Sequence, residues 1–306
     1  MSNKHQNITK VYINTHKYDL YQAKACIASV RYWYPDISII LIKDLGSGIF
    51  DTKLIEKIWN VKVFNTEKKV FGWGYGKLEP LFLNEHDIFL MLDADTVMLG
   101  PLLDNLCNYQ FDFLIDAEVQ PEWRFNQIYY NLNRINEIAP EFNYPGYSFN
   151  SGQWIGKSGI LKRTDFELTL SWTTPPTPKF PDIVFNGDQA HLNFVLHKLG
   201  SEKKIQVERQ KIMIFPENGN AEFISIEQIK NKINCYPYIL HWAGYKKINN
   251  KAMPRYDIFK FFQAFYYDKM SSQEKYIDLF FIKKYKFERY IKYHWRKLIQ
   301  VHYFFK

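Results

Sequence analysis

The stretch FLMLDADTVMLGPL, residues 89–102, places two aspartates one residue apart in an otherwise apolar run. A carboxylate beside so much apolar surface is costly unless something pairs with it. No Lys or Arg lies nearer in sequence to Asp93 and Asp95 than Lys77. The pair therefore needs a positive charge from another part of the fold or from a bound cation.

The segment before Asp93 belongs to a regular alternation. Short apolar runs alternate with segments of helical periodicity along the first ninety residues. These runs and segments are 11–14, 20–34, 38–42, 54–59, 61–64 and 88–92. Such alternation predicts an α/β fold with a mostly parallel sheet flanked by helices. Ligands bind beyond the carboxyl ends of strands in open α/β sheets, which is where Asp93 is expected.

The rest of the chain is patterned less regularly. We predict strands at 111–115, 211–215 and 238–242, a helix at 188–200 that ends at Gly200, a polar helical stretch at 122–140, a proline-rich loop without regular structure at 173–181, and helices beyond 254.

Composition is that of an ordinary globular chain. Its 306 residues are 46% hydrophobic and 24% charged, which suits one large α/β domain or two small ones. The three cysteines lack metal-ligand spacing and fit buried thiols in a reducing compartment. Residues 1–10 are polar and unlike a signal peptide, and no apolar run reaches the roughly 18 residues of a membrane span. We therefore expect a cytosolic protein.

The chemistry of the acidic pair has two interpretations. Carboxylates at i and i+2 after a strand can converge on one hard cation. A divalent ion there could bridge a diphosphate and neutralise a departing nucleoside diphosphate. Alternatively, Asp95 caps a turn or a short helix. The aspartates by themselves do not decide between these.

Three further motifs follow in order. They are Phe149-Asn150-Ser151-Gly152, then Asp188-Gln189 at the start of a helix, then His241, Gly244 and Lys247 after a strand. N–H groups at the start of the helix could face an anion. Taken singly, each motif could be a turn, a helix cap or a structural histidine. Their joint occurrence behind Asp-x-Asp favours a common site.

In this order the motifs resemble those of GT-A fold nucleotide-sugar glycosyltransferases, most closely the retaining glycosyltransferase family 8 type, over about residues 10–250. The resemblance implies a Rossmann-like domain, here residues 1–253, followed by a helical extension at 254–306. It also implies that Asp93, Asp95 and His241 hold Mn²⁺ or Mg²⁺. The donor would further contact Asn150, Gly152, Asp188, Gln189, Gly244 and the diphosphate-binding Lys247.

The sequence departs from the family pattern in two places. Ile248-Asn249 follow Lys247 where the family usually has Pro-Trp, and the first strand leads into Asn14-Thr15-His16-Lys17-Tyr18-Asp19. Asp19 or the ring of Tyr18 could contact the base in this second segment, with Thr15 beside them.

The segment FGWGYGKLEPL, residues 71–81, interleaves glycines with aromatic residues. Its spacing is not that of a phosphate-binding P-loop. We interpret it as a mobile loop from which Lys77 approaches a phosphate; the alternative is a plain surface loop. Trp73 or Tyr75 could equally belong to the core.

These expectations define an enzyme that moves a hexose from a nucleotide sugar, most simply UDP-hexose, to a lipooligosaccharide or other cell-envelope glycan. With retention, Gln189 steadies the oxocarbenium-like centre and Asp188 orients sugar hydroxyls; with inversion, Asp188 is the candidate base. A sugar-1-phosphate nucleotidyltransferase needs a glycine-rich basic signature that the first strand lacks. A non-catalytic glycan- or membrane-binding protein is the remaining alternative.

The last 26 residues form a distinct basic segment. Residues 281–306 hold eight Lys or Arg and one Glu, whereas the rest of the chain is nearly neutral. Helical spacing places Phe287, Tyr290, Ile291, His294, Leu298, Val301 and Phe305 on one face, and Lys286, Arg289, Lys292, Arg296 and Gln300 largely opposite. This pattern favours peripheral attachment to the anionic cytoplasmic face of a membrane. The alternative is packing on the catalytic domain; the neutral body argues against nucleic acid.

Overall fold

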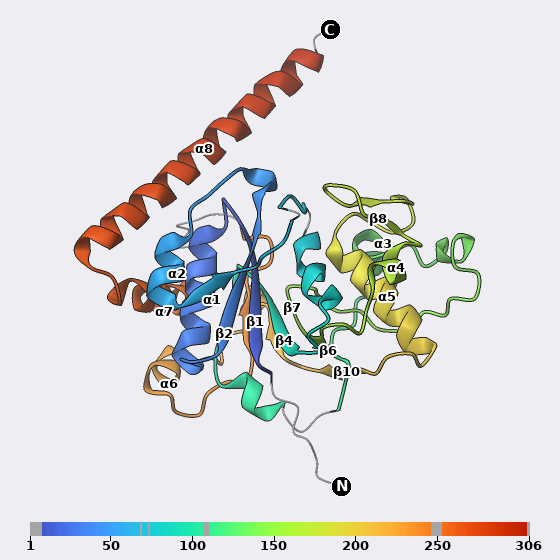
Figure 1. Cartoon of the computed structure of the whole chain (residues 1–306), viewed down its shortest axis with the longest axis horizontal. Coiled ribbons are helices and arrows are strands. Elements are labelled where there is room, and N and C mark those ends of the chain that lie inside the picture. Colours follow the sequence, from blue (N-terminus) through green and yellow to red (C-terminus); the bar gives the residue numbers. More distant parts are fainter. Residues whose placement is uncertain (1–7, 68, 73, 107–109, 246–252, 305–306) are drawn as a thin grey trace.

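The computed structural model describes residues 8–67, 69–72, 74–106, 110–245 and 253–304. Its central feature is a seven-stranded sheet in the order β10-β6-β7-β4-β1-β2-β3 (Figure 1). β7 runs antiparallel to β4 and β6, and the other neighbouring pairs are parallel. The strands are β1 (Lys10–His16), β2 (Ser38–Asp44), β3 (Val61–Val63), β4 (Ile88–Asp93), β6 (Phe113–Asp116), β7 (Gln153–Lys157) and β10 (Val207–Gln210).

Helices cover the sheet in two groups. Figure 1 shows α1 (Leu20–Trp33), α2 (Lys53–Trp59) and α7 (Tyr256–Asp268) around β1 to β3, and α3 (Glu122–Ile128), α4 (Arg163–Phe166) and α5 (Asp188–Ser201) beyond β6 and β7. Each group packs on its own apolar cluster. α1 forms because Ala23, Ile27 and Val30 recur at helical spacing and are fully buried, and it stops just before Pro35. The predicted mostly parallel α/β fold is confirmed.

A second, three-stranded sheet lies where β4 ends. It has the order β11-β12-β5, with β11 (Met213–Ile214), β12 (Ile239–His241) and β5 (Thr96–Met98). β5 begins only three residues after Asp93 and pairs antiparallel with β12, which sets His241 opposite Thr96. The acidic pair therefore occupies the passage of the chain from one sheet into the other.

Three segments differ from the prediction. Residues 122–140 do not form one helix: α3 ends at Ile128, and η4 (Ile135–Glu137) is a short 3₁₀ turn. The side chain of Asn131 accepts a hydrogen bond from the N–H of Asn133, so this region favours turns over a continuing helix. The interpretation of 71–81 as a mobile loop is wrong for Tyr75–Phe82, which form the buried 3₁₀ helix η2. Inside the proline-rich segment, β9 (Thr177–Pro178) pairs with β8 (Leu170–Ser171).

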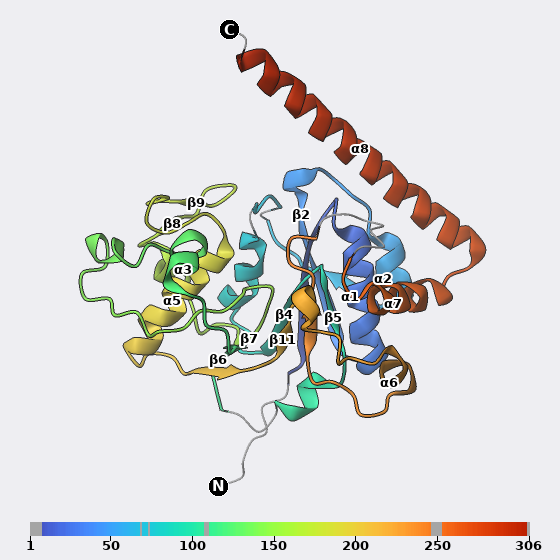
Figure 2. The same ribbon diagram turned by 180° about the vertical axis from the view of Figure 1, so that it is seen from behind.

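The remaining short elements connect these layers. They are η1 (Leu45–Ser47), η3 (Leu102–Asn105), η5 (Glu217–Gly219) and α6 (Ile226–Asn231). Figure 2, the view from behind, shows α6 near the end of α1, where the Tyr32 hydroxyl donates to the carbonyls of Ile229 and Lys230.

The chain ends in the long helix α8 (Ser272–Phe304). Figures 1 and 2 both show α8 following one edge of the body and then extending past it. α7, just before it, is an integral part of the core, since Ile258, Phe259 and Phe262 pack in the cluster that also holds α1. Among the described residues, no helix is both long enough and apolar enough to span a bilayer.

Candidate active site

The backbone fixes the directions of Asp93 and Asp95. The N–H of Asp93 donates to the carbonyl of Gly152 at 2.7 Å, and the carbonyl of Asp95 accepts from the N–H of Trp242 at 3.0 Å. The Thr96 hydroxyl closes the turn by donating to the Asp93 carbonyl at 2.8 Å. The strand ladders and these bonds hold both carboxylates at the carboxyl edge of the large sheet, as predicted from the sequence.

His241 completes a three-residue cluster with this pair. Its Nε2 lies 3.2 Å from Oδ1 of Asp95, and one ligand atom from each of Asp93, Asp95 and His241 lies within 4.8 Å of the others. Burial lowers the pKa of His241, but the carboxylates of Asp95 and then Asp93 outweigh it, so the pKa is raised overall. The Nδ1 atom is buried without a hydrogen-bond partner among the described residues.

Gly152 leaves room for this histidine. A Cβ atom at residue 152 would lie 2.2 Å from Cε1 of His241 and 2.8 Å from its Nδ1. Two carboxylate oxygens and an imidazole nitrogen form a donor set that suits Mn²⁺ better than Mg²⁺. The residues present therefore fit the divalent cation that the sequence resemblance implies.

Lys77 supplies an internal positive charge to the cluster. Its Nζ lies 2.9 Å from Oδ1 of Asp93 and 2.9 Å from Oδ2 of Asp188, and it donates to the carbonyl and hydroxyl of Ser151 at 3.1 and 3.2 Å. The side chain is only 4% exposed. Burial lowers the pKa of Lys77, but its two carboxylate partners more than reverse this. Burial raises the pKa of Asp93, the Lys77 ammonium opposes that effect, and Asp95 reinforces it. The predicted phosphate contact of Lys77 stays a prediction.

The segment 149–152 is attached to the start of α5. The side-chain amide of Asn193 accepts from the N–H of Phe149 at 3.1 Å and donates to its carbonyl at 2.9 Å. Oε1 of Gln189 accepts from the N–H of Ser151 at 3.2 Å, and Oδ1 of Asn150 accepts from the N–H of Gly152 at 2.8 Å. The second and third sequence motifs are thereby brought to one place.

Two positioning residues were missed in the sequence. Asn193 lies one helical turn after Gln189, and that spacing could have indicated it. Tyr75, fully buried, accepts a hydrogen bond from the N–H of Gly187 at 3.0 Å and donates to Asn186 at 3.0 Å, which holds the start of α5. Its place in the core agrees with one of the two interpretations offered for it.

The turn after β1 contributes a fourth carboxylate, that of Asp19. Oδ1 of Asp19 accepts from the Thr15 hydroxyl at 2.5 Å and from the N–H of His16 at 2.7 Å. Burial raises the pKa of Asp19 to about 6 against the opposing effects of His16 and Thr15. β1 is paired in register with β4, so that Asn14 lies opposite Asp93 and this turn borders the metal-ligand cluster.

Two members of the predicted site stand apart from this geometry. Gly244 lies in the turn after β12 with a positive φ of 80°, a conformation that favours glycine. Lys247, and Trp73 in the glycine-rich segment, lie outside the described residues.

Comparison with known proteins supports the fold assignment. No protein-family model matches the sequence, and no curated protein matches it. Among solved structures, the apo bifunctional glycosyltransferase WbbM is similar with a TM-score of 0.57 at 14% identity, over 84% of this chain and 50% of WbbM. The chain thus spans about half the length of WbbM.

Two other structures align over a larger share of their own length. The galactosyltransferase LgtC, in complex with donor and acceptor sugar analogues, gives a TM-score of 0.53 at 14% identity, over 88% of this chain and 99% of LgtC. The apo glycosyltransferase GlyE of Streptococcus pneumoniae TIGR4 gives 0.50 at 12% identity, over 91% of this chain and 64% of GlyE. These structures are of glycosyltransferases, and at 12–14% identity they show that the chain shares the GT-A fold.

Proposed function

We propose that this chain is a metal-dependent hexosyltransferase of the retaining glycosyltransferase family 8 type. It takes a hexose from a nucleotide sugar, UDP-hexose in the simplest case, and transfers it to a lipooligosaccharide or other cell-envelope glycan. One observation carries the proposal: Asp93, Asp95 and His241 converge at the carboxyl edge of the sheet, beside the start of α5 with Asp188 and Gln189. At this level of sequence identity, the structural neighbours support the fold alone.

The three clustered residues would hold Mn²⁺ or Mg²⁺. There the cation would supply positive charge against the negative charge of the diphosphate. His241 is a suitable ligand because its ring is buried beside Asp95 and Gly152 leaves room for it there. Lys247, Gly244, Thr15, Tyr18 and Asp19 complete the proposed nucleotide-binding set.

Asp188 would orient the donor sugar. It is 5% exposed and shares the ammonium of Lys77 with Asp93, so its carboxylate is a poor candidate for taking a proton from an acceptor. This supports retention over inversion. The acceptor oxygen would bond to C1 on the face from which the diphosphate departs, and its proton would pass to a phosphate oxygen. Gln189, which is only partly buried and is bonded to Ser151, would steady the sugar centre with Asn150.

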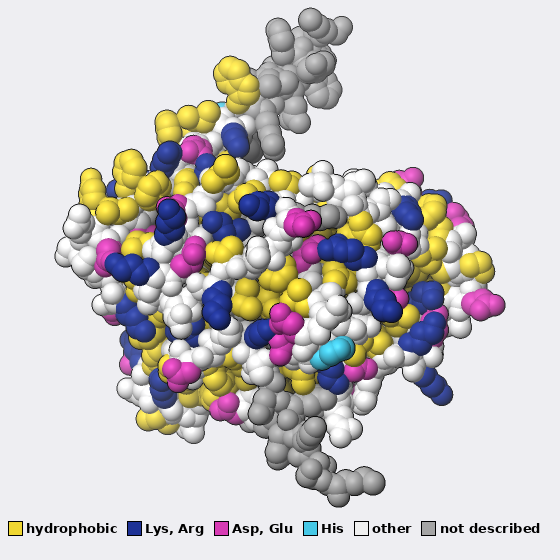
Figure 3. Space-filling model, in the orientation of Figure 1, with side chains coloured by type: hydrophobic (Ala, Val, Ile, Leu, Met, Phe, Trp, Pro, Cys, Tyr) yellow, Lys and Arg dark blue, Asp and Glu magenta, His cyan; other side chains and the backbone are white. Residues whose placement is uncertain are grey.

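The orientation of α8 supports attachment to an anionic membrane. The residues that face the body, Asp278, Ile282 and Tyr285, are 7–8% exposed. Figure 3 shows hydrophobic side chains along the outer side of α8. Exposed apolar residues of α8 include Tyr276 (74%), Phe280 (56%), Phe287 (64%), Tyr290 (61%), Ile291 (46%) and Trp295 (65%). Together with the Lys and Arg residues of α8, these apolar side chains suit the headgroup region of an anionic cytoplasmic leaflet.

A hydrolysis assay tests the reaction. The full chain is incubated with UDP-hexoses, with and without Mn²⁺, and release of UDP is followed. Slow, Mn²⁺-dependent release of UDP is expected of a transferase that lacks its acceptor. A nucleotidyltransferase would instead release pyrophosphate from UTP and a sugar 1-phosphate, and a binding protein would do neither. Either of the latter results overturns the proposal.

A further inference from the structure

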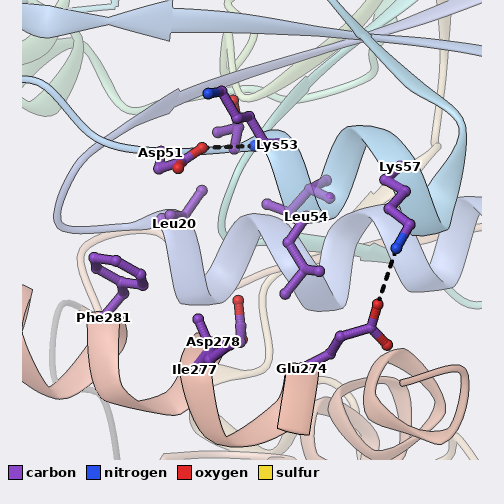
Figure 4. A pocket seen from close by; sticks show the side chains of 11 residues that line it. Leu20, Asp51, Lys53, Leu54, Lys57, Glu274, Ile277, Asp278 and Phe281 are labelled. Carbon is purple, nitrogen blue, oxygen red and sulfur yellow. Dashed lines mark hydrogen bonds and ion pairs between the residues drawn. The ribbon is translucent and has the colours of Figure 1, made fainter. Parts of the chain in front are cut away.

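The start of α8 is fixed to the body by a buried ion pair. Nζ of Lys24, on α1, lies 2.7 and 2.6 Å from the two carboxylate oxygens of Asp278, and the hydroxyl of Tyr267 donates to the same carboxylate at 2.8 Å. Figure 4 shows Asp278 on α8 facing α1, at one side of a pocket of about 260 Å³ between α1, α2 and α8. Removing one partner of a buried pair leaves an uncompensated charge. The pair therefore holds the N-terminal part of α8 against α1.

The middle of α8 is fixed to the turn between β1 and α1. Lys17 forms an ion pair with Glu288, and its ammonium lies 4.8 Å from the centre of the Tyr285 ring. The hydroxyl of Tyr285 accepts a hydrogen bond from the N–H of Asp51 at 3.3 Å. Because Lys17 directly follows β1, these contacts set α8 beside the turn that carries Tyr18 and Asp19.

Two basic residues of α8 then lie over Tyr18. The guanidinium carbon of Arg289 lies 6.0 Å from the centre of the Tyr18 ring, and Nζ of Lys292 lies 5.7 Å from it. Arg289 and Tyr18 also line a small crevice with Tyr21. Burial raises the pKa of the Tyr21 phenol; Asp95 adds to this and Arg289 opposes it, which places Tyr21 within the fields of both.

The site is rich in negative charge, which favours basic side chains beside Tyr18. Asp19, Asp93, Asp95 and Asp188 bring four carboxylates to one region, and Lys77 is engaged by two of them. A nucleoside diphosphate adds further negative charge when it binds. Arg and Lys are suited to phosphate oxygens, Arg because its planar group can bond two oxygens at once. Arg289 and Lys292 bring two such cationic groups to within 6.0 and 5.7 Å of the centre of the Tyr18 ring.

We propose that Arg289 and Lys292 of α8, which lie beside the Tyr18 ring, are part of the donor site and bind phosphate oxygens of the nucleoside diphosphate. This rests on the proposed function, because it assigns two further residues to the same donor. The two faces of α8 would then have different functions. The outer face would contact the membrane, and the face that carries Arg289 and Lys292 would border the nucleotide site.

The test measures UDP binding to the full chain by calorimetry with saturating Mn²⁺ and without vesicles. The variant R289Q/K292Q keeps much of the length of both side chains and removes both charges. The control K283Q/K284Q removes the same charge from exposed lysines of α8 for which no contact with Tyr18 is found. Thermal unfolding without ligand verifies that both variants keep the fold.

We expect R289Q/K292Q to bind UDP at least about tenfold more weakly than the wild type, while K283Q/K284Q binds as the wild type does. R289K/K292Q should recover part of the loss, because it restores the charge at residue 289 without the planar group. Equal binding by R289Q/K292Q and the wild type overturns the proposal, as does equal weakening in both double variants. If the wild type itself does not bind UDP, the proposed function fails instead.

Discussion

Nζ of Lys77 lies 2.9 Å from Oδ2 of Asp188, a residue 111 positions later in the chain, and the same ammonium is 2.9 Å from Asp93. The positive charge that the acidic segment required is therefore present in the fold itself. The ammonium balances carboxylates from the sheet edge and from the start of α5, two parts of the site that are far apart in the sequence.

Replacing Lys77 with Met should destabilise the protein. The variant leaves two carboxylates without their shared cation, and we expect a loss of about 3 kcal/mol in the free energy of unfolding. Urea unfolding at neutral pH measures it, with K53M as an exposed-lysine control. Mn²⁺ should stabilise K77M more than the wild type, because it meets an uncompensated Asp93. An unchanged unfolding midpoint would show that the ion pairs contribute nothing.

Asp95→Asn should abolish Mn²⁺-dependent release of UDP. The amide keeps the shape of the side chain but lacks the charge that a hard cation prefers. We expect turnover to fall by roughly a hundredfold or more, as for other groups that stabilise developing charge. D36N, in an exposed turn, is the matched control. Normal turnover in D95N would refute the assignment of the metal ligands.

Gly152→Ala should weaken metal binding without unfolding the protein. The added methyl would meet Cε1 of His241 at 2.2 Å, so the ring must rotate away from Asp95. We expect Mn²⁺ affinity, measured by calorimetry, to fall at least about tenfold. In G200A, the new methyl meets its nearest neighbour at an ordinary 3.6 Å, and that variant should bind as the wild type does. Equal affinity in G152A would mean that His241 is not a ligand.

Mn²⁺ affinity should rise with pH through the raised pKa of His241. Asp95 and Asp93 keep the proton on this imidazole to a higher pH than usual, and a metal ion must displace that proton. The raised pKa of His241 also affects the stability of the metal-free protein. The ion pair of protonated His241 with Asp95 stabilises the folded state fully below the pKa that His241 has in the unfolded chain. This stabilisation is lost as pH rises through the pKa that His241 has in the folded protein. Titrations between about pH 6 and 8 measure the slope, which H241Q should flatten.

Polar substitution of the outer face of α8 should release the protein from membranes. F287S/Y290S/I291S removes three exposed apolar side chains, and we expect less sedimentation with anionic liposomes at low salt but unchanged UDP release. V119S/W123S/F223S removes exposed apolar side chains from the body instead and should sediment normally. If the full wild-type chain stays in the supernatant, the membrane proposal fails.

Local patterns in the sequence predicted most of the large sheet. Periodicity identified β4 and α1, and the position of Asp93 after an apolar strand indicated the ligand-binding edge. The order of the motifs suggested that His241 lies near Asp95. In the structure, the pairing of β12 with β5 places the two side chains in contact. These features depend on patterns within a few residues or on strand order.

Contacts between distant segments could not be predicted in this way. The glycine-rich segment gave no sign that Lys77 would be buried against Asp188, because that contact depends on how η2 packs on α5. Periodicity also distinguished the two faces of α8 but did not say which one would dock. The buried pair of Lys24 with Asp278 decides it, and the partners are 254 residues apart.

Asp93, Asp95 and His241 lie where the chain passes from β4 in the large sheet to β5 in the small one, so a bound cation would connect the two sheets. Asp93 ends a strand of the large sheet, whereas His241 ends a strand of the small one. A cation held by both would be a cross-link between two separately hydrogen-bonded layers, closing the long chain loop between Asp95 and His241. Loading the site should therefore slow the separation of the two sheets, so that protease resistance near β12 becomes a measure of occupancy.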